Sequence, residues 1–128
     1  MSRTKLNTKK DFKPAPNLDL RGKIGTKVLG IFRGRLESKG YPGKFSTMLD
    51  VLDTDGDTTL YNKETEEAVS VDIVAGDRVF LKEGTVLAIE MAKLKEGDKV
   101  EIVYVGKGDA KPGRKAPFLY DVFLIEDK

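Results

Sequence analysis

The chain of 128 residues contains no cysteine, no histidine and no tryptophan. The lack of cysteine excludes disulfides, thiol nucleophiles and thiolate metal sites. The lack of histidine removes the commonest general base near neutral pH and most ligand sets for zinc. These absences argue against enzymatic activity, and we predict a non-enzymatic protein that uses no cofactor and no metal.

Long apolar runs are also missing. No stretch approaches the ~20 residues that cross a bilayer as a helix, and the N-terminus lacks the apolar region of a secretory signal. We therefore expect a cytoplasmic protein without membrane contact. The hydrophobic fraction of 39% is sufficient for the core of a single domain at this chain length.

Charge is small in total but unevenly placed along the chain. The net charge is +2, yet residues 1–35 contain ten Lys or Arg and two acids, whereas residues 45–90 contain eleven acids and three bases. This asymmetry predicts a basic surface that binds a polyanion, opposed by an acidic surface. Residues 1–20 are polar, Lys-rich and interrupted by Pro14 and Pro16, so we predict a flexible basic arm there and a folded domain at 21–128.

Most of the remaining chain has the composition of β-strands. A long strand is predicted at 27–36, with bulges at Gly30 and Gly34. One segment alone has helical spacing, residues 85–94, and Thr85 is its expected cap. Further strands are predicted at 44–52, 58–61, 68–73, 78–81, 99–105 and 117–125.

This order of elements predicts a fold that is mainly β. A long bent strand, a hairpin, one short helix and a final hairpin are typical of a five-stranded Greek-key barrel of the oligonucleotide-binding (OB) type. The short strands within 68–81 would then be an elaboration that precedes the helix. An SH3-like barrel and a small β-sandwich are the alternatives.

The C-terminal third carries a resemblance to a known family. The segments concerned are 84–87 (GTVL), 94–98 (LKEGD), 99–107 (KVEIVYVGK) and 120–123 (YDVF). With this pattern the chain resembles the small OB-fold single-stranded DNA-binding proteins of bacteriophages. The resemblance implies an OB barrel, sequence-independent binding of single-stranded DNA during phage-type replication or recombination, and a location in the cytoplasm of an infected cell.

Binding of a single strand requires cations for the phosphates and flat side chains for the exposed bases. In an OB barrel the binding groove crosses strands two and three, between the first and the last hairpin loops. Two-residue spacing predicts that Arg33 and Arg35 share one face of the first strand. The complete set of predicted nucleic-acid-binding residues is Arg33, Arg35, Lys39, Tyr41, Lys44, Tyr61, Lys107, Lys111, Arg114, Lys115 and Phe118.

The sequence is compatible with two other functions. The chain is alternatively a structural or interaction protein, such as a virion component or a polymerase-associated factor, whose basic arm contacts a partner. RNA is an alternative ligand, because stacking and phosphate contacts do not read the sugar.

One acidic motif resembles a metal site only superficially. Asp53, Asp55, Asp57 and Glu64 have the spacing of a calcium-binding loop, but Thr58 occupies the position that requires glycine. An acidic hairpin turn is the better interpretation of this segment.

Overall fold

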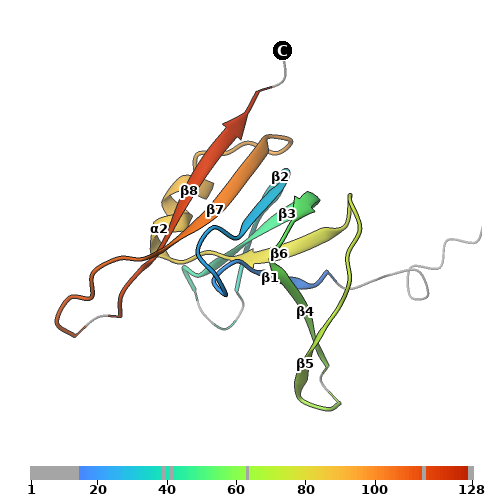
Figure 1. Ribbon diagram of the computed structural model, residues 1–128, viewed down its shortest axis with the longest axis horizontal. Helices are drawn as coiled ribbons and strands as arrows, with labels where there is room; N and C mark the ends of the chain where they lie inside the picture. Colours follow the sequence, from blue (N-terminus) through green and yellow to red (C-terminus); the bar gives the residue numbers. More distant parts are fainter. Residues whose placement is uncertain (1–14, 39, 41, 63, 114, 127–128) are drawn as a thin grey trace, which may run out of the picture.

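The computed structural model describes residues 15–126 except 39, 41, 63 and 114. Within these residues the fold is mainly β, as predicted, with eight strands and one short helix (Figure 1). The elements are β1 (Asn17–Asp19), β2 (Lys27–Glu37), β3 (Phe45–Thr54), β4 (Asp57–Asn62), β5 (Glu67–Ser70), β6 (Arg78–Lys82), α2 (Thr85–Met91), β7 (Lys99–Lys107) and β8 (Phe118–Ile125).

All eight strands belong to one sheet, in the order β5-β4-β1-β6-β3-β2-β7-β8. The pairing of β1 with β6 is parallel, and every other pairing is antiparallel. Strands β5 and β8 are the two edges, so the described sheet is open rather than closed. The β4–β5 hairpin projects away from the other strands (Figure 1).

Strand β2 is long and irregular, as its glycines predicted. It pairs with β3 along its length and with β7 only through residues 27–31. The register shifts at Leu29/Gly30 and at Phe32/Gly34. A Cβ at Gly30 would lie 2.9 Å from the backbone oxygen of Asp50, so this position requires glycine for the close approach of β3.

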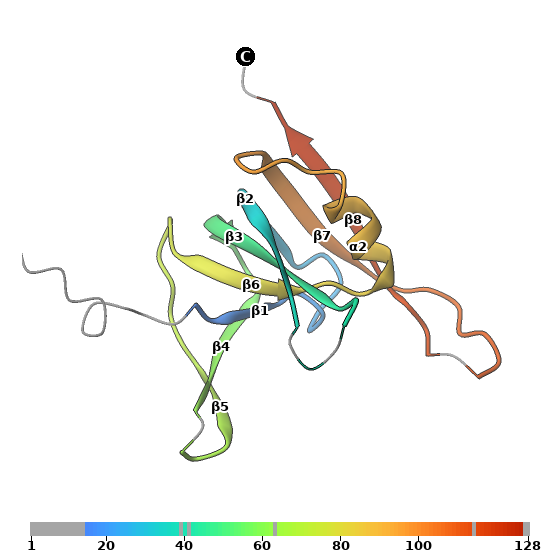
Figure 2. The ribbon, with the colours of Figure 1, turned by 180° about the vertical axis from the view of Figure 1, so that it is seen from behind.

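The core lies on one face of the curved sheet. Alternate residues of the central strands point into it, because successive side chains of a strand face opposite sides. Helix α2 adds Leu87 and Met91, which are four residues apart and therefore share one side of the helix. The helix contacts β8 and covers one end of the sheet (Figure 2). The fully buried side chains are Leu20, Val28, Thr47, Leu49, Val79, Leu87, Met91, Val100 and Ile102.

The ends of the helix differ from the prediction. Gly84 occupies the N-cap position without any side-chain cap, and Thr85 is already the first helical residue. The helix ends at Met91 rather than at residue 94, because Leu94 N–H donates to the carbonyl of Met91 in a tighter turn. Both corrections move an end of the helix without changing which face it buries.

The boundary of the predicted arm is wrong at its C-terminal side. Residues 17–19 form β1, and the side chains of Leu18 and Leu20 are buried in the core. A three-residue strand has too little alternation to stand out in a sequence, since its pairing partners come from distant segments. Residues 1–14 of the predicted arm lie outside the described residues.

Candidate nucleic-acid interface

The side of β2, β3 and β6 that faces away from the core forms what we call the outer face. On β3, Met48 and Asp50 alternate with the buried Thr47 and Leu49. The register places Met48 opposite Phe80 of β6, and Asp50 opposite Arg78. The outer face therefore brings an apolar pair and a charged group side by side.

Two arginines on the outer face share one carboxylate. Arg33 Nε donates to Asp50 Oδ2 at 2.8 Å, and Arg78 Nε donates to Asp50 Oδ1 at 2.9 Å. Partial burial would raise the pKa of Asp50, but the hydrogen bonds from Arg78 and Arg33 outweigh it and lower the pKa below its ordinary value. The carboxylate therefore stays ionised, and this cluster carries a net charge of one positive unit.

The geometry of this cluster suits a phosphate. The side chains of Arg33 and Arg78 are 36% and 48% exposed, whereas Asp50 is 20% exposed. Asp50 thus holds both guanidinium groups in place and leaves part of each exposed to solvent. A guanidinium presents a planar set of N–H donors that matches a phosphate, and prior fixation reduces the entropy lost on binding.

An apolar platform adjoins the arginine cluster. Met48 and Phe80 are opposite each other and only partly buried. Lys82 follows two residues after Phe80 on the same side of β6 and is exposed. Flat or polarisable side chains next to cations are the elements with which single-strand-binding surfaces hold stacked bases.

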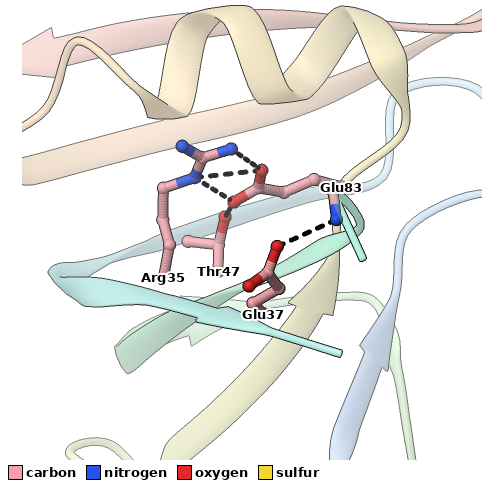
Figure 3. Close-up of polar contacts among 5 residues, drawn as sticks. Arg35, Glu37, Thr47 and Glu83 are labelled. Atoms are coloured by element: carbon pink, nitrogen blue, oxygen red, sulfur yellow. Dashed lines mark hydrogen bonds and ion pairs between the residues drawn. The ribbon is translucent and has the colours of Figure 1, made fainter. Parts of the chain in front are cut away.

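Arg35 does not belong to the outer face, which corrects the prediction that it shares a face with Arg33. Arg33 is the extra residue of the bulge at Phe32/Gly34, so the alternation of β2 shifts there and Arg35 lies opposite the buried Thr47. Two nitrogens of Arg35 donate to the carboxylate of Glu83 at 2.6–3.1 Å (Figure 3). Its guanidinium also lies 4.3 Å from the ring centroid of Phe45. Arg35 therefore supports the fold.

The Arg35–Glu83 pair is part of a buried network. The side chain of Glu83 is fully buried, and its Oε2 also accepts a hydrogen bond of 2.6 Å from the hydroxyl of Thr47. Nearby, Gly43 N–H donates to Glu37 at 2.8 Å, which holds the loop between β2 and β3 (Figure 3). These contacts fix the end of the sheet from which α2 begins.

The last hairpin loop supplies exposed cations, as predicted. Lys107, Lys111 and Lys115 are exposed. Lys111 and Lys115 line a pocket of about 300 Å³ together with Thr85 and Val86 at the start of α2. The basic loop thus lies next to the helix.

Phe118 has contacts that compete with a stacked base. The guanidinium of Arg21 lies 4.6 Å from its ring centroid and Lys107 Nζ lies 5.5 Å from it. Its ring is also 6.3 Å from that of Tyr104, in a tilted arrangement, and it packs against the core. Phe118 therefore joins the loop to the core, and its predicted stacking on a base has no support from these contacts.

The other predicted residues are scattered. Tyr61 is 57% exposed on β4, which β1 and β6 separate from β3 in the sheet. Lys44 is exposed at the end of the first hairpin loop, where its carbonyl accepts from Ser38 N–H at 2.8 Å. Lys39, Tyr41 and Arg114 lie outside the described residues.

Five outer-face residues were not predicted: Met48, Asp50, Arg78, Phe80 and Lys82. A signal for three of them is present in the segment 78–82, RVFLK. Once Val79 and Leu81 are assigned to the core, strict alternation puts Arg78, Phe80 and Lys82 on the outside. The bulge at Arg33 has no comparable signal, because its position depends on pairing with β3.

Comparison of the chain with protein-family models, curated proteins and solved structures finds no match. Among the described residues, no three or more Asp or Glu side chains are grouped so that they could hold a metal ion. The described part of the chain contains no helix that is long and apolar enough to cross a membrane.

Proposed function

We propose that this chain is a non-enzymatic protein that binds single-stranded DNA on its outer face, and that its fold is an OB-type barrel left partly open. The order β6-β3-β2-β7-β8, with α2 between β6 and β7, supports this assignment. Strands β3 and β6 then correspond to the second and third strands of an OB barrel, which carry the ligand in that architecture.

The observation that carries the proposal is the Arg33–Asp50–Arg78 cluster beside Met48 and Phe80. Guanidinium groups contact phosphates without regard to sequence, and the apolar pair offers a surface for bases. The helix α2 has seven residues and is partly buried, so it offers no element for reading a duplex major groove. The proposed ligand is therefore a single strand, in phage-type replication or recombination.

The first test is fluorescence anisotropy with a labelled oligo-dT of about 30 nucleotides, in a salt series, with duplex DNA as competitor. We expect binding that weakens with salt and resists the duplex, because neutralised phosphates release counterions. An oligo-U of equal length measures the preference for the sugar, since the proposed contacts do not involve it. Absence of binding at low salt would overturn the proposal.

Substitutions identify the surface. The double variant Arg33→Ala/Arg78→Ala should bind at least about tenfold more weakly, and its logarithmic salt slope should fall by about 1.4, which corresponds to two lost phosphate contacts. Lys93→Ala is the matched control, because Lys93 is an exposed cation that pairs with Glu90 of α2 and belongs to none of the proposed contacts. Equal binding by the double variant and Lys93→Ala would contradict this assignment of the surface.

A truncation separates this function from the role of a structural protein whose basic arm contacts a partner. Removal should be limited to residues 1–14, because residues 17–20 belong to the sheet and the core. The truncated chain should retain most of its affinity for oligo-dT if the outer face is the binding surface. Complete loss of binding would assign the activity to the arm instead.

A further inference from the structure

A small pocket lies where the sheet fails to close. It has a volume of about 210 Å³ and is formed by β1, β4, β6, the residues that follow β1, and Tyr120 of β8. No ladder joins β8 to β1 or β6 in the described chain, so the space between these strands stays open. We call it the seam pocket, and its polar or aromatic lining residues are Asn17, Asp19, Arg21, Thr59, Lys82 and Tyr120.

The seam pocket has an apolar floor and an aromatic wall. Leu18 and Leu81 form the floor and are at most 4% exposed. Tyr120 is partly buried, and its ring is held 5.6 Å from that of Tyr104. A volume of this size is below the ~300–1,000 Å³ of pockets for larger ligands, so it suits one flat ring rather than two.

The rim supplies positive charge. Arg21 Nε donates to Asp19 Oδ1 at 3.0 Å, and the guanidinium lies over the ring of Phe118, so this cation is held in place. Lys82 is exposed at the end of β6. With Asp19 included, the three charged groups of the rim sum to one positive unit, which suits the phosphate attached to a bound ring.

One carboxylate oxygen of Asp19, Oδ2, is available to discriminate between bases in the pocket. Asp19 Oδ1 accepts from both the backbone N–H and Nε of Arg21, whereas Oδ2 has no hydrogen bond among the described residues. A carboxylate oxygen accepts from the exocyclic amino group of cytosine and has no donor to accept from at the corresponding oxygen of thymine. The amide of Asn17 and the hydroxyl of Thr59 add donors and acceptors on the same rim.

We propose that the seam pocket holds one cytosine base of the bound strand, the DNA base that combines a single ring with an exocyclic amino group, with its phosphate near Arg21 and Lys82. This inference rests on the proposed function. It adds a preference among bases to a surface that otherwise contacts only the phosphates and the faces of the bases. The pocket also connects the outer face, through Lys82, to β8 and the basic loop that precedes it.

Nuclear magnetic resonance on the ¹⁵N-labelled full chain tests this inference directly. The chain is titrated with deoxycytidine monophosphate, deoxythymidine monophosphate and inorganic phosphate. We expect the cytidine nucleotide to shift the amide resonances of Leu18, Thr59 and Tyr120. The dissociation constant from these shifts should be at least about fivefold lower for the cytidine nucleotide than for the thymidine nucleotide. Inorganic phosphate alone should leave the amide of Tyr120 unmoved.

Variants separate recognition from folding. Asp19→Asn replaces one acceptor oxygen by a donor while the remaining oxygen can still accept from Arg21, so the preference for cytidine over thymidine should disappear or reverse. Asp121→Asn is the matched control, because Asp121 is exposed on β8 and does not line the pocket. A preference that survives Asp19→Asn would overturn the assignment of Asp19.

The outcomes for the two proposals differ. If oligonucleotides shift the amides of Met48 and Phe80 but no nucleotide shifts those of Leu18, Thr59 and Tyr120, the seam-pocket inference is wrong and the proposed function stands. Equal shifts with the cytidine and thymidine nucleotides would also overturn the stated preference. If no oligonucleotide shifts any amide of the chain, the proposed function itself is overturned.

Discussion

Removal of the Glu83 carboxylate is the substitution whose effect on stability follows most directly from the structure. Its side chain is fully buried and accepts from Arg35 and from Thr47, so Glu83→Ala breaks both contacts at once. The Thr47 hydroxyl, which is fully buried, would then lack an acceptor. The guanidinium of Arg35 would keep its charge next to an apolar ring.

The magnitude follows from what each group loses. Breaking a buried ion pair by removing one partner costs about 3–5 kcal/mol of unfolding free energy. The side chain of Arg35 is 23% exposed, so water can partly solvate the orphaned charge. We therefore expect the lower end of that range, about 3 kcal/mol.

Urea denaturation at neutral pH, followed by far-ultraviolet circular dichroism, measures this loss. Glu90→Ala is the matched control: Glu90 pairs with Lys93 at 3.3 Å on α2, with side chains 42% and 65% exposed, and it should cost at most about 0.5 kcal/mol. The triple replacement Glu83→Leu/Arg35→Met/Thr47→Val should recover most of the stability, because apolar side chains can substitute for a buried pair and no buried hydroxyl is then left without an acceptor. A cost of Glu83→Ala below about 1 kcal/mol would refute the reasoning.

Two further predictions concern acid and close packing. Hydrogen bonds from arginines outweigh partial burial and lower the pKa values of Asp19 and Asp50 in the fold. The two ionised carboxylates therefore stabilise the fold fully above about pH 5, and this contribution is lost as the pH falls below the ordinary pKa of ~3.9. The urea midpoint should fall less steeply with acid in Asp19→Asn/Asp50→Asn than in the unchanged chain. Gly56→Ala should cost about 1–3 kcal/mol in thermal or urea unfolding, since the added Cβ would lie 2.9 Å from the Asp19 carbonyl oxygen and from Leu18 and Leu20, whereas Gly40→Ala meets nothing within 4 Å and should be nearly neutral.

The sequence predicts the strands of this fold better than it predicts their partners. Segments such as 78–82 and 99–107 alternate cleanly between buried and outward residues, and alternation is a local property. Strand β1 and the open sheet are consequences of long-range pairing, which no local pattern specifies.

The same difference between local patterns and long-range pairing explains which residues of the candidate site could be predicted. The basic character of the loop at 107–115 is evident from composition, and the exposed Lys107, Lys111 and Lys115 agree with it. The faces of Arg33 and Arg35 were assigned from two-residue spacing, and a single bulged residue reversed one of them. Alternation within 78–82 puts Arg78 on the outside, but its place beside Arg33 depends on Asp50, which is 28 residues away in the chain.

The position of β1 has a consequence for synthesis of the chain. Among the described residues, this three-residue strand is the only one outside the β4–β5 hairpin that pairs with it, because β4 pairs with β1 and β5 alone. It leaves the ribosome before either partner, and its β6 partner at Phe80 follows about 60 residues later, which at ~5–20 residues per second is about 3–12 s. During that interval Leu18 and Leu20 have no core to enter. We therefore expect the nascent chain to expose these two leucines to chaperones until β6 has emerged.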